Sequence, residues 1–285
     1  MSATTKLAFW HIHAEWSDTG QGGSLWLLGR RYQHVDGRKQ DDKPEGVEFK
    51  PLGVIILANA IKDMGALLVL NLASNNLFAE GIELLAEALK GNQIMTELNV
   101  SGNAATWDGN KHGEMSGVIA LADAIPDMGA MTSLDISNNS IGLIDIFLDG
   151  WRSKDNDGRA PFVHTGGRKQ NAVPEGAKSS GVIAIANVIP DMRALSHFDI
   201  SSNDLRTEGG KALPEALKGN QIMTALNVSS NALTYNTKAE PGKMDGLVAL
   251  ADAISDMGAL TKLDACSNDI GDDGEDALKK AAGSR

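Results

Sequence analysis

Cysteine is almost absent from this chain, and its scarcity restricts the class of protein. Among 285 residues Cys266 is the only cysteine, so no disulfide can form within the chain. Small domains that depend on disulfides are thereby excluded, and a reducing compartment is favoured. We therefore expect an intracellular, cytoplasmic protein.

Long apolar stretches and an excess of basic residues are also missing. No run of eighteen apolar residues occurs, and the first residues contain no apolar segment of signal-peptide length, so no membrane insertion is expected. The formal net charge is −11, which argues against nucleic acid or an anionic membrane as the partner. The charge favours a protein partner that carries basic groups.

A repeated pattern is what the chain has in abundance. In Leu134-Asp135-Ile136-Ser137 the apolar residues alternate, which predicts a short strand with its apolar side chains on one face, and Asn139 follows. A helical segment precedes it at 118–125 and is stopped by Pro126. Related patterns recur along the chain, and they end at Asn75, Asn103, Asn139, Asn203, Asn231 and Asn268.

The spacing of these asparagines indicates the type of repeat. They lie 28, 36, 64, 28 and 37 residues apart, which fits a unit of 28 residues with inserted loops. A period in the twenties with the pattern LxLxxN is typical of leucine-rich repeats. The chain resembles leucine-rich repeat proteins of the ribonuclease-inhibitor-like type over residues 53–143 and 181–285.

That resemblance implies an architecture. It is an α/β solenoid, curved and right-handed, with parallel strands on the concave face and helices on the convex face. The asparagines are expected to form a ladder whose buried amides bond the backbone of the turns, where an unpaired group would cost about 1 to 3 kcal/mol.

A longer segment is duplicated. Residues 87–96 recur without change at 215–224, and the offset between the halves is about 129 residues. We interpret residues 1–285 as a single solenoid with duplicated halves at about 1–130 and 131–285. Loop or hairpin inserts are expected at about 16–49, 106–116, 143–179 and 234–245, a C-terminal cap at 272–285, and an additional strand around 7–11.

The outward-facing strand positions predict a polar strip on the concave face. We name as candidate partner-binding residues Asn71, Asn99, Asp135, Asp199, Asn227 and Asp264. Small residues follow two places later, namely Ala73, Ser101, Ser137, Ser201, Ser229 and Cys266. Either a partner is seated on this strip, or the positions are small and polar because the inner side of a curved sheet is crowded.

The inserts differ in composition from the repeats, because all five tryptophans lie outside the repeat cores. Trp, Tyr and Arg are enriched in binding hot spots. The candidate partner-binding residues here are Trp26, Trp107, Trp151, Tyr235, Arg38 and Arg168. Alternatively, the aromatic residues form satellite cores that fix each insert to the solenoid.

The N-terminus contains the sharpest chemical pattern. His11, His13 and Glu15 alternate, so on a strand all three would face one side, as metal ligands must. The second half has no counterpart of this pattern. No phosphate-binding GxxxxGK[ST] occurs, and no Ser, His and Asp set can be assembled. We expect no enzymatic activity and no cofactor.

The function expected from these features is a non-enzymatic protein–protein interaction scaffold that uses the concave strip and the inserts. Three alternatives stay open. The chain could be a structural subunit of a larger assembly, or a small-GTPase regulator, since Ran GTPase-activating proteins are similar in repeat type. It could also have a metal-dependent activity at the N-terminal His-x-His.

Overall fold

The computed structural model describes residues 5–8, 52–62, 67–107, 115–142, 180–235 and 244–283. Short strands alternate with helices along these ranges. The strands are β1 (Thr5–Ala8), β2 (Leu67–Asn71), β3 (Glu97–Asn99), β4 (Ser133–Asp135), β5 (His197–Asp199), β6 (Ala225–Asn227) and β7 (Lys262–Asp264). The helices are α1 (Leu52–Lys62), α2 (Phe78–Leu89), α3 (Ser116–Ala124), α4 (Ser180–Val188), α5 (Arg206–Leu217), α6 (Asp245–Asp256) and α7 (Gly271–Gly283).

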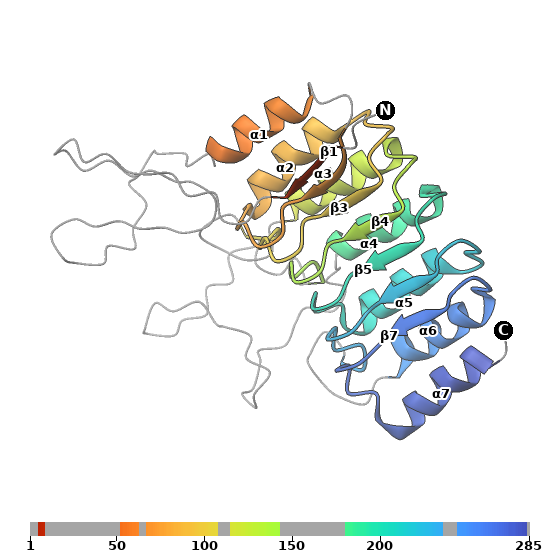
Figure 1. The fold of residues 1–285 in the computed structure, drawn as a ribbon. Coiled ribbons are helices and arrows are strands. Elements are labelled where there is room, and N and C mark those ends of the chain that lie inside the picture. The colour runs from red at the N-terminus through yellow and green to blue at the C-terminus, as the bar shows by residue number, and fades with distance from the viewer. Residues whose placement is uncertain are drawn as a thin grey trace, which may run out of the picture.

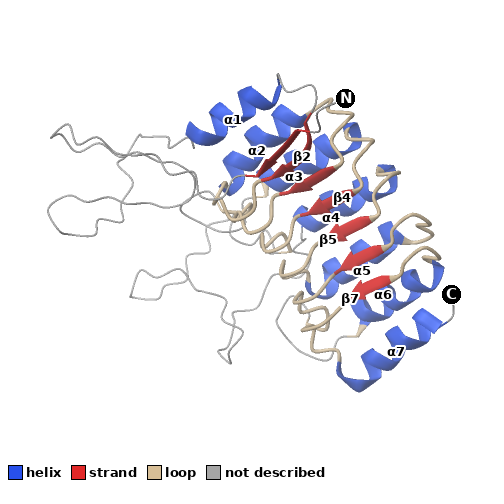
Figure 2. Cartoon of the chain, viewed as in Figure 1, coloured by secondary structure: helices blue, strands red, loops and turns tan. Residues whose placement is uncertain are grey.

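All described strands form one parallel sheet in chain order, from β1 to β7. The register repeats at each step, since Leu70 pairs with Leu98, Leu98 with Leu134, and Leu134 with Phe198. The helices form a second layer along one side of this sheet, and the strand side is uncovered by them (Figures 1 and 2). This is the leucine-rich repeat solenoid that the sequence predicts.

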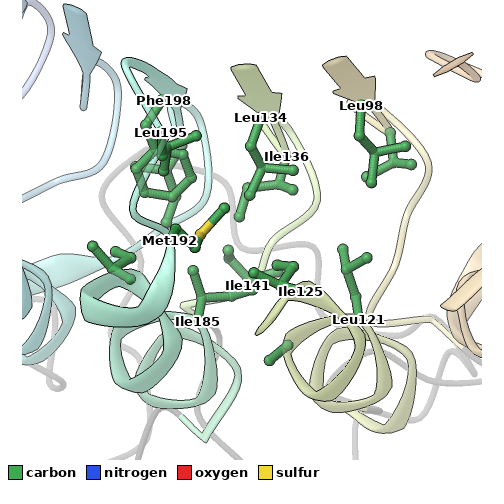
Figure 3. Close-up of a cluster of buried hydrophobic side chains, with 14 of the residues drawn as sticks. Leu98, Leu121, Ile125, Leu134, Ile136, Ile141, Ile185, Met192, Leu195 and Phe198 are labelled. Atoms are coloured by element: carbon green, nitrogen blue, oxygen red, sulfur yellow. The ribbon is translucent and has the colours of Figure 1, made fainter. Parts of the chain in front are cut away.

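The core lies between the two layers. Strand residues such as Leu134 and Phe198 point toward the helices, and helix residues such as Leu121 and Ile185 point toward the strands (Figure 3). These side chains are 3 % exposed or less. Each unit therefore buries its apolar face against its neighbours, as expected for a solenoid.

Glycine near the start of each helix lets neighbouring units approach closely. From α1 to α7 the position is occupied by Gly53, Gly81, Gly117, Gly181, Gly209, Gly246 and Gly274. At Gly117 an added Cβ would lie 2.4 Å from the carbonyl oxygen of Ala79 in the preceding helix. No other residue fits at that distance, so the glycine is required by packing.

The boundaries differ from the expectation in two places, at β1 and at α7. β1 (Thr5–Ala8) begins two residues before the expected strand around 7–11, and Leu7 pairs with Leu70; residues 9–11 lie outside the described residues. α7 begins at Gly271, one residue before the expected cap. Pro126 and Pro190 follow α3 and α4 in short 3₁₀ turns, η1 (Ile125–Asp127) and η3 (Ile189–Asp191), whereas Pro214 lies inside α5.

Candidate protein-interaction surface

The asparagine ladder supports the surface from beneath. The Oδ1 atom of each of five asparagines accepts the backbone N–H of the asparagine in the preceding unit, at 2.8 to 2.9 Å. The Nδ2 atom of Asn103 donates to the carbonyls of Leu72 and Val100, both at 2.8 Å. All six asparagines are 1 % exposed or less. The amides therefore satisfy turn backbone groups inside the protein, as expected for the ladder.

The six strip positions share one conformation. In each, the side-chain Oδ1 accepts the backbone N–H two residues later, at 2.9 to 3.0 Å. All six side chains are half-buried. One side of each Asn or Asp thus closes a local turn, and the other side faces along the strip. This bond explains why only Asn and Asp occur here.

The middle of the strip holds two carboxylates side by side. Asp135 and Asp199 are register partners on β4 and β5. Asn99 Nδ2 donates to Asp135 Oδ2 at 2.9 Å, and Asn227 Nδ2 donates to Asp199 Oδ2 at 2.8 Å. The row is therefore amide, carboxylate, carboxylate, amide. Asn99 donates toward the following unit and Asn227 toward the preceding one, so the two amides enclose the carboxylates from both sides.

Burial raises the pKa of the Asp135 carboxyl above its ordinary value. The neighbouring Asp199 charge acts in the same direction, whereas hydrogen bonds from Ser137 and Asn99 lower the pKa. Two partly desolvated carboxylates on adjacent strands repel each other, so a cation between them would be stabilised.

A third outward column was missed at the level of sequence. Its exposed members are Glu97, His197 and Lys262, each two residues before a strip residue. Next to it, a column of hydroxyls bonds backbone carbonyls of the preceding unit at 3.0 to 3.2 Å, from Thr96, Thr132, Ser196, Thr224 and Thr261. The signal was a Ser or Thr two residues before the inward-facing residue of each strand from β3 to β7.

Trp107 and Tyr235 lie where the ladder turns end. The ring of Trp107 meets that of Phe78 edge to face, with centroids 5.1 Å apart. The backbone carbonyl of Trp107 accepts a hydrogen bond from the N–H of Ala79 at 3.0 Å. In the same way, the carbonyl of Tyr235 accepts the N–H of Thr207 at 2.8 Å. The ring contact gives the Trp107 side chain a role in packing, whereas the contact of Tyr235 with Thr207 is made by its backbone. A role in binding stays a prediction.

Several sequence candidates lie outside the described residues. These are Trp26, Trp151, Arg38 and Arg168, and the metal-site candidates His11, His13 and Glu15. Within the part that the structure describes, no three His, Cys, Asp or Glu side chains are grouped to hold a metal ion. No helix in that part is long and apolar enough to cross a membrane.

Comparisons with known proteins agree with the architecture. A family profile described as Leucine Rich repeat matches residues 192–213. No curated protein matches the sequence.

Solved structures show distant similarity. The tropomodulin C-terminal domain of Caenorhabditis elegans aligns with a TM-score of 0.44 and 10 % identity, over 71 % of this chain and 92 % of that chain. Leiomodin-1 Actin-Binding Site 2 aligns with a TM-score of 0.45 and 14 % identity, over 70 % and 86 % of the two chains. At these values neither similarity bears on the function of this chain.

Proposed function

We propose that this chain is a non-enzymatic interaction scaffold whose strip binds a basic segment or surface of another protein. The observation that carries the proposal is the pair of neighbouring carboxylates Asp135 and Asp199 in the middle of the strand face. Glu97 and Asp264 add negative charge to the same face, and lysines occupy only the two ends of the flanking column among the described strands, Lys6 on β1 and Lys262 on β7. Lysine and arginine side chains would complement this row.

The strip is suited to binding because its side chains are already fixed. Asp199 Oδ1 accepts both the N–H and the hydroxyl of Ser201, at 3.0 and 2.7 Å, while Oδ2 is held by Asn227. A partner would therefore order few side chains on this surface, which reduces the entropic cost of association. The ladder beneath extends the same rigidity along the solenoid.

The finer classification is part of the proposal. One strand and one full helix in each unit support the ribonuclease-inhibitor-like type. Equivalent bonds 128 residues apart support the duplication: Ala79 N–H donates to the carbonyl of Trp107 at 3.0 Å, and Thr207 N–H donates to that of Tyr235 at 2.8 Å. The inserts flank the strip in the sequence, and we propose them as a second contact surface.

A paired substitution tests the role of the strip. Asn occupies the Asp135 and Asp199 position in three other units, so Asp135→Asn with Asp199→Asn keeps the acceptor for the turn and removes two charges. The matched control is Asp123→Asn with Asp252→Asn, which removes the same charge from exposed sites on α3 and α6.

The measurement is binding of a fluorescent lysine- and arginine-rich peptide to the full chain at near-physiological salt. We expect the strip variant to bind at least about tenfold more weakly and the control to stay within about twofold. An equal loss of affinity in both variants would mean that the peptide responds only to the net charge of the protein, and would contradict the proposal.

A further inference from the structure

The outer face of the helices exposes large aliphatic side chains in a regular row. Ile119 on α3, Ile183 on α4 and Val248 on α6 are 39, 36 and 50 % exposed. Each lies two residues after the helix glycine. We call this position in the six helices α1 to α6 the helix row, and it is occupied by Ile55, Glu83, Ile119, Ile183, Lys211 and Val248.

The helix row follows adjacent helices, because each of these helices contacts the next one along the chain. It reads apolar, acidic, apolar in the first half and apolar, basic, apolar in the second. When a second copy faces the row with its helices in the opposite order, the acidic residue of one copy lies opposite the basic residue of the other, and apolar residues lie opposite apolar ones. Glu83 then lies opposite Lys211, Ile119 opposite Ile183, and Ile55 opposite Val248.

We propose that a second copy of this chain docks on the helix row in the antiparallel direction, about a two-fold axis between α3 and α4. Each contact then occurs twice, as an isologous interface requires. A parallel arrangement would place Glu83 against Glu83 and Lys211 against Lys211. The sign change between the halves thus selects the antiparallel dimer.

Two features set the strength of this dimer. Lys211 Nζ lies 3.3 Å from Asp245 Oδ2, but both side chains are largely exposed, and such surface pairs hold their partners weakly. Asp123 is exposed beside the row on α3, and Glu87 on α2 is paired with Lys90 at 2.8 Å, so neither adds attraction across the interface. The dimer is therefore weak, as transient interfaces are. The strand face stays open for another partner.

Charge reversal and restoration test the arrangement. Sedimentation equilibrium of the full chain should show a dimer that dissociates on dilution. Glu83→Lys or Lys211→Glu alone should weaken it at least about tenfold, since each change creates two like-charge contacts. The combined variant Glu83→Lys with Lys211→Glu should recover the original dissociation constant to within about threefold, because the pairs are restored in reverse.

Matched controls lie on the strand face. Glu97→Lys and Lys262→Glu make the same changes in net charge at exposed sites of β3 and β7, and should leave the dimer unaltered. Circular dichroism melting establishes that each variant is folded. Three results would each overturn the proposal. The chain could stay monomeric up to about 1 mM, or the combined variant could dimerise no more tightly than the single variants. The third is a dissociation constant that Ile119→Asp does not change.

Discussion

Asp135 shows how one side chain on the strip combines a structural bond with an electrostatic cost. Its Oδ1 closes the turn to Ser137, while burial and the adjacent Asp199 disfavour its charge. A carboxyl whose pKa is raised in the folded state binds protons more tightly there than in the unfolded chain. Its contribution to stability is therefore largest at low pH and falls as pH rises above the ordinary value of 3.8.

Asp135→Asn should change the pH profile of stability. The amide cannot ionise, so the stability of the variant relative to the original should increase as pH rises from about 3 to 7. The bond from Asn99 lowers the pKa of Asp135 and is already contained in its net upward shift, so it does not change the direction of this profile. The free energy of unfolding, measured by denaturant titration at several pH values, gives the result. A difference that is flat across this range would show that Asp135 is not electrostatically strained.

At this scale the sequence predicted the identity of the strip but not its bonds. Period-two alternation placed Asn71 to Asp264 on the outward face. The bond from Oδ1 to the N–H two residues later is local, but the pairing of Asp135 with Asn99 depends on a distance between units that no local pattern contains. The column of Glu97, His197 and Lys262 was missed because only the positions between the buried strand residues were considered.

Among the elements, the contact between α2 and α3 depends on Gly117. A methyl group there would overlap the Ala79 carbonyl, and its relief requires the two helices to separate. Gly117→Ala should therefore destabilise the protein by about 1 to 3 kcal/mol, although alanine favours a helix.

Gly129→Ala is the matched control, because a Cβ at Gly129 meets no atom within 4 Å. Its effect on the free energy of unfolding should stay within about 0.5 kcal/mol. Equal effects of the two substitutions, measured by denaturant unfolding, would mean that close helix packing does not explain the glycine.

Pro214 makes α5 weaker than its counterpart α2. Proline lacks the N–H that an interior helix position donates, and α2 has Ala86 at the equivalent site. Pro214→Ala should stabilise the protein by about 1 to 3 kcal/mol. Pro126→Ala, at an exposed site in η1, should change stability by less than about 1 kcal/mol. If the melting temperature does not rise for Pro214→Ala, the packing of the proline ring stabilises the protein as much as the helical hydrogen bond that alanine would restore.

The existence and order of these elements were predictable, because the 28-residue period fixes one strand and one helix in each unit. Their ends were less so. Prolines after α3 and α4 mark helix termini as a local rule predicts, whereas packing between neighbouring units keeps Pro214 inside α5. The start of β1 was misplaced because its register is set by pairing with β2.

The whole molecule is held by interactions between adjacent units, so distant units should contribute independently. Asn103→Ala and Asn231→Ala should each lower the free energy of unfolding by about 1 to 3 kcal/mol. The loss in the double variant should equal the sum of the two single losses to within about 0.5 kcal/mol.

Asn103 and Asn139 should behave differently, because the Asn103 N–H donates directly to Asn139 Oδ1 at 2.9 Å. Their double variant should depart from additivity by at least about 0.5 kcal/mol. Denaturant unfolding of the two double variants and their single variants gives both values. Additivity in both pairs would show that the ladder does not couple the units.

The function is the part that repeats specify least. Their spacing determines a rigid open strand face, and the two aspartates at its centre give that face a charge, but the shape of a partner is not contained in either.

The most direct test of the central claim uses the single cysteine. Cys266 lies exposed on the strand side, two residues after Asp264 of the strip. The hydrogen bond to Asp264 and its charge raise the pKa of the Cys266 thiol, so a photo-crosslinking maleimide is attached at mildly alkaline pH. The control combines Cys266→Ser with Asp276→Cys, which moves the label to an exposed site on α7. After irradiation in lysate, we predict a discrete adduct with a basic protein from Cys266 and none from position 276. An adduct from position 276 alone would contradict the assignment of the strand face as the binding surface.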